Sequence, residues 1–172
     1  MSVAHPWIEA RPRPTKQLPT DRQEERIQQL LSTNNMGVLS TSGTDGPIGS
    51  PIEFYAEGLA LYMYPDPGTP KVKAIERDPR VCFSVFMPYV GWASARGCQM
   101  FCTAQLLEAE MPEWYHGMEI YRWQTASVEL HREVARPPAG RLLKLEPHRI
   151  LYLEMWLSRE GYAPRQTWHK ND

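Results

Sequence analysis

The sequence predicts a mostly β protein in which an antiparallel sheet or barrel is accompanied by a few helices. Short apolar segments recur between residues 36 and 64, and only turn residues separate them. Strands joined by such tight turns pair as antiparallel neighbours, because parallel pairing needs a long crossover connection. With 172 residues, of which 42% are hydrophobic and 23% charged, the chain suits one globular domain with its own core.

The composition argues against several functional classes. The formal net charge of -1 gives no excess of cations that would attract nucleic acid or an anionic membrane. No apolar run approaches the ~20 residues that span a bilayer, and the first residues lack the apolar core of a signal peptide, so we expect a cytoplasmic protein. The three cysteines are interpreted as reduced core residues, and the five histidines show no metal-ligand spacing: Cys82, Cys98 and Cys102; His5, His116, His131, His148 and His169.

The N-terminal part of the chain divides into an arm and a helix. Residues 1–19 carry four prolines and are expected to form an extended arm, which leaves residues 20–172 as the single domain. The first helix is predicted to begin at Thr20, because Thr20 and Gln23 fit a capping box. Its apolar stripe consists of Ile27, Leu30 and Leu31.

The remaining elements follow from apolar runs and their breakers. Pro51 within the second strand implies an edge position or a bulge. A helix is predicted over residues 112–135, where the aromatic residues are interpreted as packing, and residues 159–172 are expected to form a tail. The predicted strands cover residues 36–41, 47–55, 59–64, 81–86, 98–108, 141–147 and 149–157.

A short helix between the third and fourth strands raises a functional question. Thr69 suits the N-cap position, Pro70 suits the first helical position, and the helix is predicted to end near Arg77. A helix N-terminus attracts anions, and Lys71 and Lys73 add positive charge close to it. The residues alone leave two interpretations open, a cradle for a phosphate or a solvated surface helix.

The order of these elements resembles the FMN-binding split-barrel family, which includes pyridoxamine 5'-phosphate oxidase. The best-matched stretch is "YPDPGTPKVKAIERDPRV", in which Tyr64, Thr69, Lys71 and 78–80 fall in register with the family's motif. The resemblance covers residues 20–108 and extends more loosely through "LEPHRILYLEMW". It implies a six-stranded antiparallel split barrel with flanking helices, FMN as cofactor, FMN-dependent oxidoreduction of a small molecule, and a homodimer with FMN sites at the subunit interface.

The resemblance also implies positions for the cofactor site. Thr69 and Lys71 would contact the phosphate, while Pro65 and Pro70 stand in the same cradle where the oxidases usually carry threonine and arginine. The partner subunit would contribute residues between Arg96 and Gln99 and the tail around Trp168. The strand that would lay its backbone along the flavin ring consists of Ser50, Pro51, Ile52, Glu53 and Phe54, and Phe54 replaces a lysine that often approaches the flavin.

One departure argues against vitamin B6 as the substrate. The oxidases end with an Arg-x-His pair that handles the pyridoxine ring, whereas this chain carries Arg159, Glu160 and Gly161 at the comparable place. Catalytic residues stay unassigned, since no Ser-His-Asp or Cys-His arrangement is visible and a flavin would need none. The alternatives are a protein that holds FMN or haem without turnover, and a deazaflavin-dependent reductase.

Overall fold

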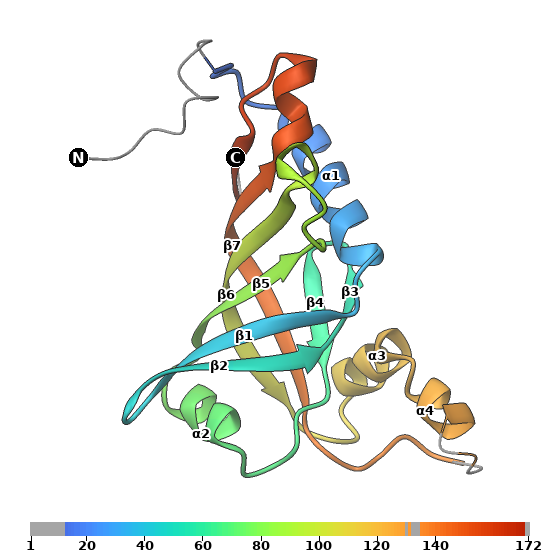
Figure 1. The fold of residues 1–172 in the computed structure, drawn as a ribbon. Coiled ribbons are helices and arrows are strands. Elements are labelled where there is room, and N and C mark those ends of the chain that lie inside the picture. Colours follow the sequence, from blue (N-terminus) through green and yellow to red (C-terminus); the bar gives the residue numbers. More distant parts are fainter. Residues whose placement is uncertain (1–12, 130, 132–134, 171–172) are drawn as a thin grey trace.

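A single curled antiparallel sheet dominates the computed structural model, which describes residues 13–129, 131 and 135–170 (Figure 1). Its order is β2-β1-β5-β6-β7-β4-β3, and β8 also pairs with β7. The predicted fold class is confirmed, although the sheet has eight strands and not six, because a short β3 and a C-terminal β8 add to it. The strands are β1 (Met36–Gly43), β2 (Gly46–Glu53), β3 (Tyr55–Glu57), β4 (Ala60–Met63), β5 (Arg80–Phe86), β6 (Arg96–Leu107), β7 (Leu142–Glu154) and β8 (Arg165–His169).

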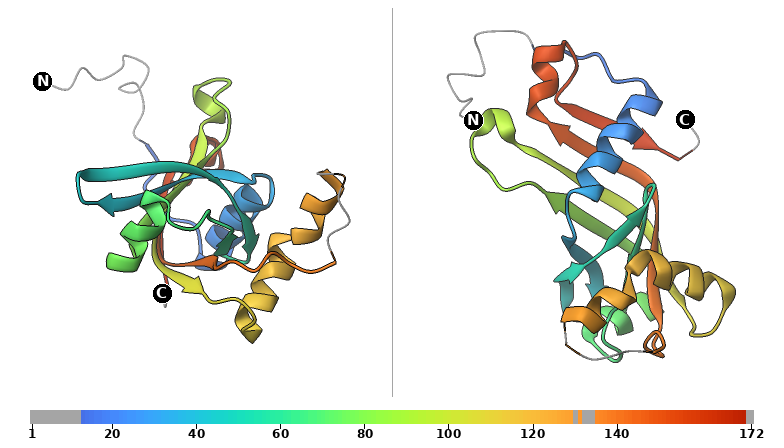
Figure 2. Two further views of the ribbon diagram at one scale, coloured as in Figure 1. Left: turned by 90° about the horizontal axis from the view of Figure 1, so that it is seen from below. Right: turned by 90° about the vertical axis from the view of Figure 1, so that its right-hand side faces the viewer.

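Helices lie at both ends of the curled sheet (Figures 1 and 2). The helix α1 and the 3-10 helices η1 and η2 lie near one end, and α2, α3 and α4 lie near the other. None of the helices in the described part of the chain is long and apolar enough to cross a membrane. Their bounds are α1 (Thr20–Ser32), α2 (Pro70–Arg77), η1 (Trp92–Ser94), α3 (Pro112–Tyr121), α4 (Trp123–Glu129) and η2 (Met155–Glu160).

The helix α1 packs its apolar stripe into the core as predicted, but its cap differs. Pro19 is the N-cap residue and no side chain caps the helix, so the predicted capping box is wrong. Gln23 is buried and its amide donates to the carbonyl of Leu18 instead, at 2.8 Å. The Leu18 carbonyl is held in position for this bond, because the Leu18 N–H donates to Oε1 of Gln166.

That hydrogen bond ties the end of the predicted arm to the C-terminal segment. The N–H of Ala163 also donates to the carbonyl of Lys16, at 2.8 Å. Residues 13–19 have no regular secondary structure. Because of these hydrogen bonds they nevertheless lie against the segment that precedes β8. The rest of the predicted arm, residues 1–12, lies outside the described residues, and the boundary between arm and domain stays a prediction.

Two elements differ from the sequence-based expectation. The helix predicted over residues 112–135 is broken at Arg122, whose φ of 57° is left-handed and separates α3 from α4; residues 130 and 132–134 lie outside the described residues. The two strands predicted around Pro147 are one strand, β7, in which His148 is an extra residue: Phe101 pairs with Arg149, and Cys102 pairs with Pro147. A bulge of this kind accommodates the missing N–H of a proline within a strand.

The sheet has an inner face that forms the core and an outer face that carries the candidate site. Buried residues alternate with more exposed ones along β5 and β6, so Phe83 and Met100 point inward while Ser84 and Gln99 point outward. β2 is an edge strand, which confirms the inference drawn from Pro51. Cys98 and Cys102 are buried core residues as expected, while Cys82 is half-buried on the outer face.

Candidate functional site

The N-terminal turn of α2 has the donors that an anion needs. Thr69 is the N-cap and Pro70 the first helical residue, as predicted, but the Thr69 hydroxyl donates to the carbonyl of Asp66 and leaves the helix without a side-chain cap. The backbone N–H groups of Lys71 and Val72 precede the first intrahelical bond, which runs from Lys73 to Thr69. The first turn of α2 therefore presents the N–H groups of Lys71 and Val72, and it also carries the Lys71 side chain.

Lys71 and Lys73 differ in their surroundings. Lys71 is half-buried and Lys73 is exposed, and neither takes part in a salt bridge within the described part of the chain. Lys73 borders a cleft of 530 Å³ between α2 and the turn that joins β1 to β2, and Pro70 and Arg77 line the same cleft. The two lysines therefore serve different surfaces, and only Lys71 belongs to the part of α2 that faces away from this cleft.

The five residues predicted to lie along the flavin ring, residues 50–54, alternate between the two faces of the sheet. Ile52 and Phe54 are buried, and Phe54 packs its ring edge-on against Phe83 with the centroids 5.2 Å apart. The N–H of Phe54 also donates to the carbonyl of Asn35, so neither its side chain nor its N–H is free for a ligand. Pro51 and Glu53 lie on the outer face, and β2 leaves backbone groups unpaired along its free edge.

Glu53 is the centre of a hydrogen-bonded cluster of tyrosines. Its Oε1 accepts from the hydroxyl of Tyr55 at 3.2 Å, and its Oε2 accepts from the hydroxyl of Tyr121 at 3.1 Å. The Tyr121 ring stands edge-on to Tyr55 at 5.5 Å and lies 6.0 Å from the ring of Tyr64. Burial first, and then the Glu53 carboxylate, raise the pKa of Tyr121, so its hydroxyl stays a donor at neutral pH.

Tyr64 is fixed from the other side by the loop that precedes β7. A Cβ atom at Gly140 would lie 2.1 Å from the Tyr64 hydroxyl oxygen, so only glycine allows this approach. The carbonyl of Gly140 accepts a hydrogen bond from the indole of Trp114 at 2.8 Å, which holds the loop in place. Burial raises the pKa of Tyr64. The ring predicted to lie near the cofactor is therefore packed into a defined position.

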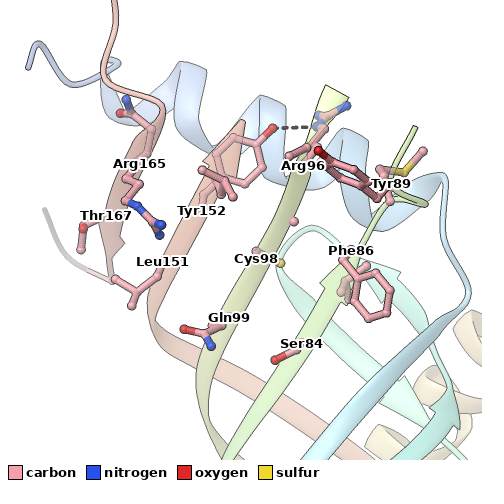
Figure 3. A pocket seen from close by; sticks show the side chains of 16 residues that line it. Ser84, Phe86, Tyr89, Arg96, Cys98, Gln99, Leu151, Tyr152, Arg165 and Thr167 are labelled. Atoms are coloured by element: carbon pink, nitrogen blue, oxygen red, sulfur yellow. Dashed lines mark hydrogen bonds between the residues drawn. The ribbon is translucent and has the colours of Figure 1, made fainter. Parts of the chain in front are cut away.

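Of the remaining predicted site residues, Gln99 lies on the outer face of β6, whereas Arg96 shares the face of buried Cys98 and Trp168 pairs with buried Ile150. A depression of 620 Å³ lies on the outer face, and its lining includes Ser84, Gln99 and Leu151 from three adjacent strands, which Figure 3 labels. Gln99 is exposed there, three strands away from Pro51 and roughly 14 Å along the sheet at the usual strand spacing. One cross-strand row joins them on the same face: Pro51, Val38, Ser84, Gln99, Leu151 and Thr167.

Arg96 and Trp168 are held by contacts within their own chain. The Arg96 guanidinium donates to the hydroxyl of Tyr152 at 2.8 Å, visible in Figure 3, and to the carbonyl of Arg26 at 2.7 Å. The indole of Trp168 is buried and donates to Glu24 at 2.8 Å. Of the residues expected to reach a partner's cofactor, Gln99 alone has an exposed side chain without such internal bonds in the described structure.

The stretch that replaces the Arg-x-His pair is used to close the 3-10 helix η2. Arg159 stacks on Trp156 with 4.4 Å between the guanidinium carbon and the ring centroid. Glu160 accepts from Arg26 at 3.1 Å, and Gly161 ends η2 with a φ of 81°. These three positions serve the local fold, and none of them carries an imidazole.

Other groups with possible chemistry are placed in the core or on solvated surfaces. Burial raises the pKa of the Cys98 thiol to about 12, so it is not a nucleophile at neutral pH. His116 is exposed and its Nε2 lies 2.9 Å from the Glu57 carboxylate. Among the described residues, no group of three or more His, Cys, Asp and Glu side chains is placed to hold a metal ion.

Sequence reasoning missed the tyrosines that surround Glu53. Its helical spacing predicts that Tyr121 packs against the core, because aromatic residues at that spacing usually serve a core. Its hydroxyl reaches Glu53 across 68 positions of the chain, a contact that no local pattern contains. Tyr55 lies two residues from Glu53 and on the same face, so alternation along the strand could have paired them.

Comparison with known proteins gives one family and a shared fold. The family model of pyridoxamine 5'-phosphate oxidase matches residues 23–154, whereas curated protein sequences give no match. A candidate pyridoxamine 5'-phosphate oxidase from Listeria innocua is 24% identical with a TM-score of 0.60, over 76% of this chain and 98% of that one.

Two further structures share the fold and differ in their ligands. A FAD-binding protein from Mesorhizobium loti is 14% identical with a TM-score of 0.58, over 72% of this chain and 87% of that one. A heme binding protein from Mycobacterium smegmatis is 16% identical with a TM-score of 0.64, over 88% of this chain and 59% of that one. At these identities the likeness concerns the fold alone.

Proposed function

This chain belongs to the pyridoxamine 5'-phosphate oxidase family, and we propose that it is an FMN-dependent oxidoreductase with its cofactor at the outer edge of the sheet. The observation that carries the proposal is the uncapped start of α2, where a half-buried Lys71 has no salt-bridge partner among the described residues. Membership of the family makes a flavin the expected cofactor. The residues of this chain determine how a flavin would be held.

The donor set at α2 fits a phosphate. The N–H groups of Lys71 and Val72 point out of the first turn, the helix dipole favours an anion, and the Lys71 ammonium adds a charge-assisted hydrogen bond. Pro70 contributes no N–H, so this cradle has fewer donors than one that carries arginine there. Phosphate binding with moderate affinity is what these groups support.

The edge of β2 and the aromatic residues beside it fit the ring system. Unpaired backbone groups on the free edge of β2 can pair with the polar edge of a flavin, and Pro51 and Glu53 present their side chains on the outer face. Tyr64, fixed by Gly140, borders the same end of the sheet. When bound, FMN supplies the two-electron redox chemistry, while the chain binds and orients it.

The substrate is proposed to be something other than pyridoxamine 5'-phosphate. Arg159 and Glu160 are engaged by Trp156 and Arg26, and the histidine of the oxidases is absent. A site that lacks the groups that orient a polar substrate discriminates strongly against it. A flat small molecule with less negative charge suits the tyrosine-lined end of the sheet better.

We also propose that the chain works as a homodimer that pairs the outer faces of two sheets. Phe86 is 64% exposed and Met36 is 53% exposed, and both lie on the outer face, which also carries half-buried Leu151 and Leu153. Apolar residues on an open sheet face favour burial against a partner. A second copy would also bring an exposed Gln99 to the face that carries Pro51 and Glu53.

The proposal is tested by the absorbance spectrum of the purified protein and by the nucleotide that it releases on denaturation. We expect FMN, and we expect the apo protein to prefer FMN over riboflavin because riboflavin lacks the phosphate. A Soret band would indicate a haem-binding protein, and a deazaflavin spectrum a different reductase. Bound FMN that no reduced nicotinamide or other small donor can bleach would indicate a carrier without turnover.

A further inference from the structure

Glu53 is a half-buried carboxylate whose position is fixed by two phenol hydroxyls. Tyr55 donates to one oxygen and Tyr121 to the other, and the two rings stand edge-on at 5.5 Å. Tyr55 comes from β3 and Tyr121 from the last turn of α3, so the carboxylate is held from two elements that are distant in sequence. Each oxygen keeps a further lone pair that can accept a hydrogen bond.

This carboxylate has no salt-bridge partner among the residues that the structure describes. None of the salt bridges there includes Glu53. Arg122 follows Tyr121 in the chain, and its guanidinium carbon lies 5.8 Å from the centroid of the Tyr55 ring. The result is a negative charge with tyrosine neighbours, on the outer face two residues from Pro51 and thus roughly 7 Å along β2.

We propose that Glu53 supplies a fixed negative charge beside the flavin ring, which lowers the tendency of the flavin to accept electrons and makes the site select neutral or cationic flat substrates over anionic ones. The inference rests on the proposed function, because it requires the flavin ring to lie along β2. Tyr55 and Tyr121 are positioning residues that act through Glu53.

Electrostatics gives the sign of both effects. Two-electron reduction at neutral pH adds negative charge to the flavin ring, and a nearby carboxylate disfavours that state. The same charge repels a carboxylate or phosphate on a substrate, while it attracts an amidinium or accepts a hydrogen bond from an N–H group. Because two hydrogen bonds fix the carboxylate, it cannot rotate away to relieve the repulsion.

The first test is the midpoint potential of bound FMN in wild-type protein and in Glu53→Gln, measured by equilibration with a redox dye. Glutamine keeps the shape and the hydrogen-bonding oxygen but removes the charge. We expect the substitution to raise the potential by about 30 mV or more, which corresponds to a tenfold change in relative affinity for reduced and oxidised flavin.

Glu57→Gln is the matched control. Glu57 lies four residues further along the chain at the end of β3, and its exposed carboxylate is paired with His116 at 2.9 Å. We expect its removal to shift the potential far less than the removal of Glu53. Equal shifts in the two variants would overturn the inference, because a distant surface charge would then act as strongly as Glu53.

The second test compares a flat cation with a flat anion, using benzamidine and benzoate titrated into FMN-loaded protein and followed by the flavin difference spectrum. Wild-type protein should bind benzamidine more tightly, and Glu53→Gln should reduce the ratio of the two affinities about tenfold while Glu57→Gln preserves it. Benzoate binding as tightly as benzamidine, or failure of both to bind, would overturn the proposed substrate class.

The outcomes separate this inference from the proposed function. Wild-type protein that takes up no flavin refutes the proposed function and the inference with it. Protein that binds FMN but keeps the same potential in Glu53→Gln refutes the inference alone. Tyr121→Phe removes one anchor and keeps the charge, so its potential should lie between those of wild type and Glu53→Gln.

Discussion

Replacing Lys71 by alanine tests whether the start of α2 is a phosphate site or a surface turn. Lys71 is half-buried, and no salt bridge in the described structure requires it. Alanine is a strong helix former, so the substitution should preserve α2. The core residues of the helix are Val72, Ala74 and Ile75, and they are untouched. We therefore expect an effect on ligand binding and little effect on folding.

The magnitude follows from the kind of contact. A hydrogen bond to a charged group is worth about 1.5–3 kcal/mol, and every 1.4 kcal/mol is about tenfold in affinity. Lys71→Ala should therefore weaken FMN binding by roughly ten- to hundredfold. The two backbone N–H groups of the first turn remain, so binding should be weakened and not abolished.

The assay is isothermal titration of apo protein with FMN and, separately, with riboflavin. Lys73→Ala is the control, because Lys73 is exposed and borders the cleft between α2 and the β1–β2 turn. We expect Lys73→Ala to change FMN affinity much less than Lys71→Ala. Riboflavin affinity should be the same in all three proteins, since riboflavin carries no phosphate for Lys71 to contact.

Two results would refute the reasoning. If Lys71→Ala binds FMN as tightly as wild type, the ammonium does not touch the phosphate and α2 is a surface helix. If Lys71→Ala weakens FMN and riboflavin equally, the lysine supports the fold of the site and not the phosphate. A thermal melt of the apo protein distinguishes the second case from general loss of stability.

The remaining predictions concern activity and stability. FMN-loaded protein should produce no pyridoxal 5'-phosphate from pyridoxamine 5'-phosphate and oxygen; turnover of about 1 per second, an ordinary enzymatic rate, would contradict this. Gly140→Ala should destabilise the fold by about 1–3 kcal/mol in denaturant titrations, since its Cβ would meet the hydroxyl of Tyr64; an unchanged midpoint would show that the loop yields. Glu154→Ala should cost about 3 kcal/mol because Glu154 is buried and paired with Arg26 at 3.1 Å. Tyr121 has a raised pKa in the folded state, so its stabilising effect is complete below about pH 10 and is lost at higher pH; Tyr121→Phe should show a shallower alkaline loss of stability.

Local patterns were sufficient for most of the fold. The start of α2, the edge position of β2 and the inward direction of Cys98 and Cys102 follow from prolines, apolar spacing and alternation. These are signals that a short segment carries by itself. The family resemblance then supplied the split-barrel class, which the family match over residues 23–154 supports.

The misses have long-range causes. Pro147 looked like the end of a strand, but β7 continues through a bulge because β6 pairs with both of its halves. Arg122 ends α3 by adopting a left-handed conformation, which arginine does not favour. The residues around it give no local signal, such as a glycine, that would predict this conformation. Gln23 caps nothing at Thr20 because the buried carbonyl of Leu18 is a better partner.

The same cause limits prediction of the candidate site. Arg96 and Trp168 look available in the sequence, but each donates to a group more than fifty residues away: Arg96 to Tyr152 and Trp168 to Glu24. Glu53 was selected for its place in a strand, and its two tyrosine donors give it a fixed orientation that the strand alone does not provide. Availability of a side chain is therefore a property of the folded molecule.

The outer face of the sheet links the cofactor proposal to the dimer proposal. Pro51 and Gln99 lie in one cross-strand row but three strands apart, so a single chain cannot place both against one flavin ring. An isologous dimer repeats the same face on both subunits, so it can bring Gln99 of one copy toward Pro51 of the other. The apolar residues of the same row, Val38 and Leu151, would be the ones that such an arrangement buries. Cofactor site and subunit interface would then occupy one continuous surface, and a charged residue at Leu151 should impair both dimerisation and FMN binding.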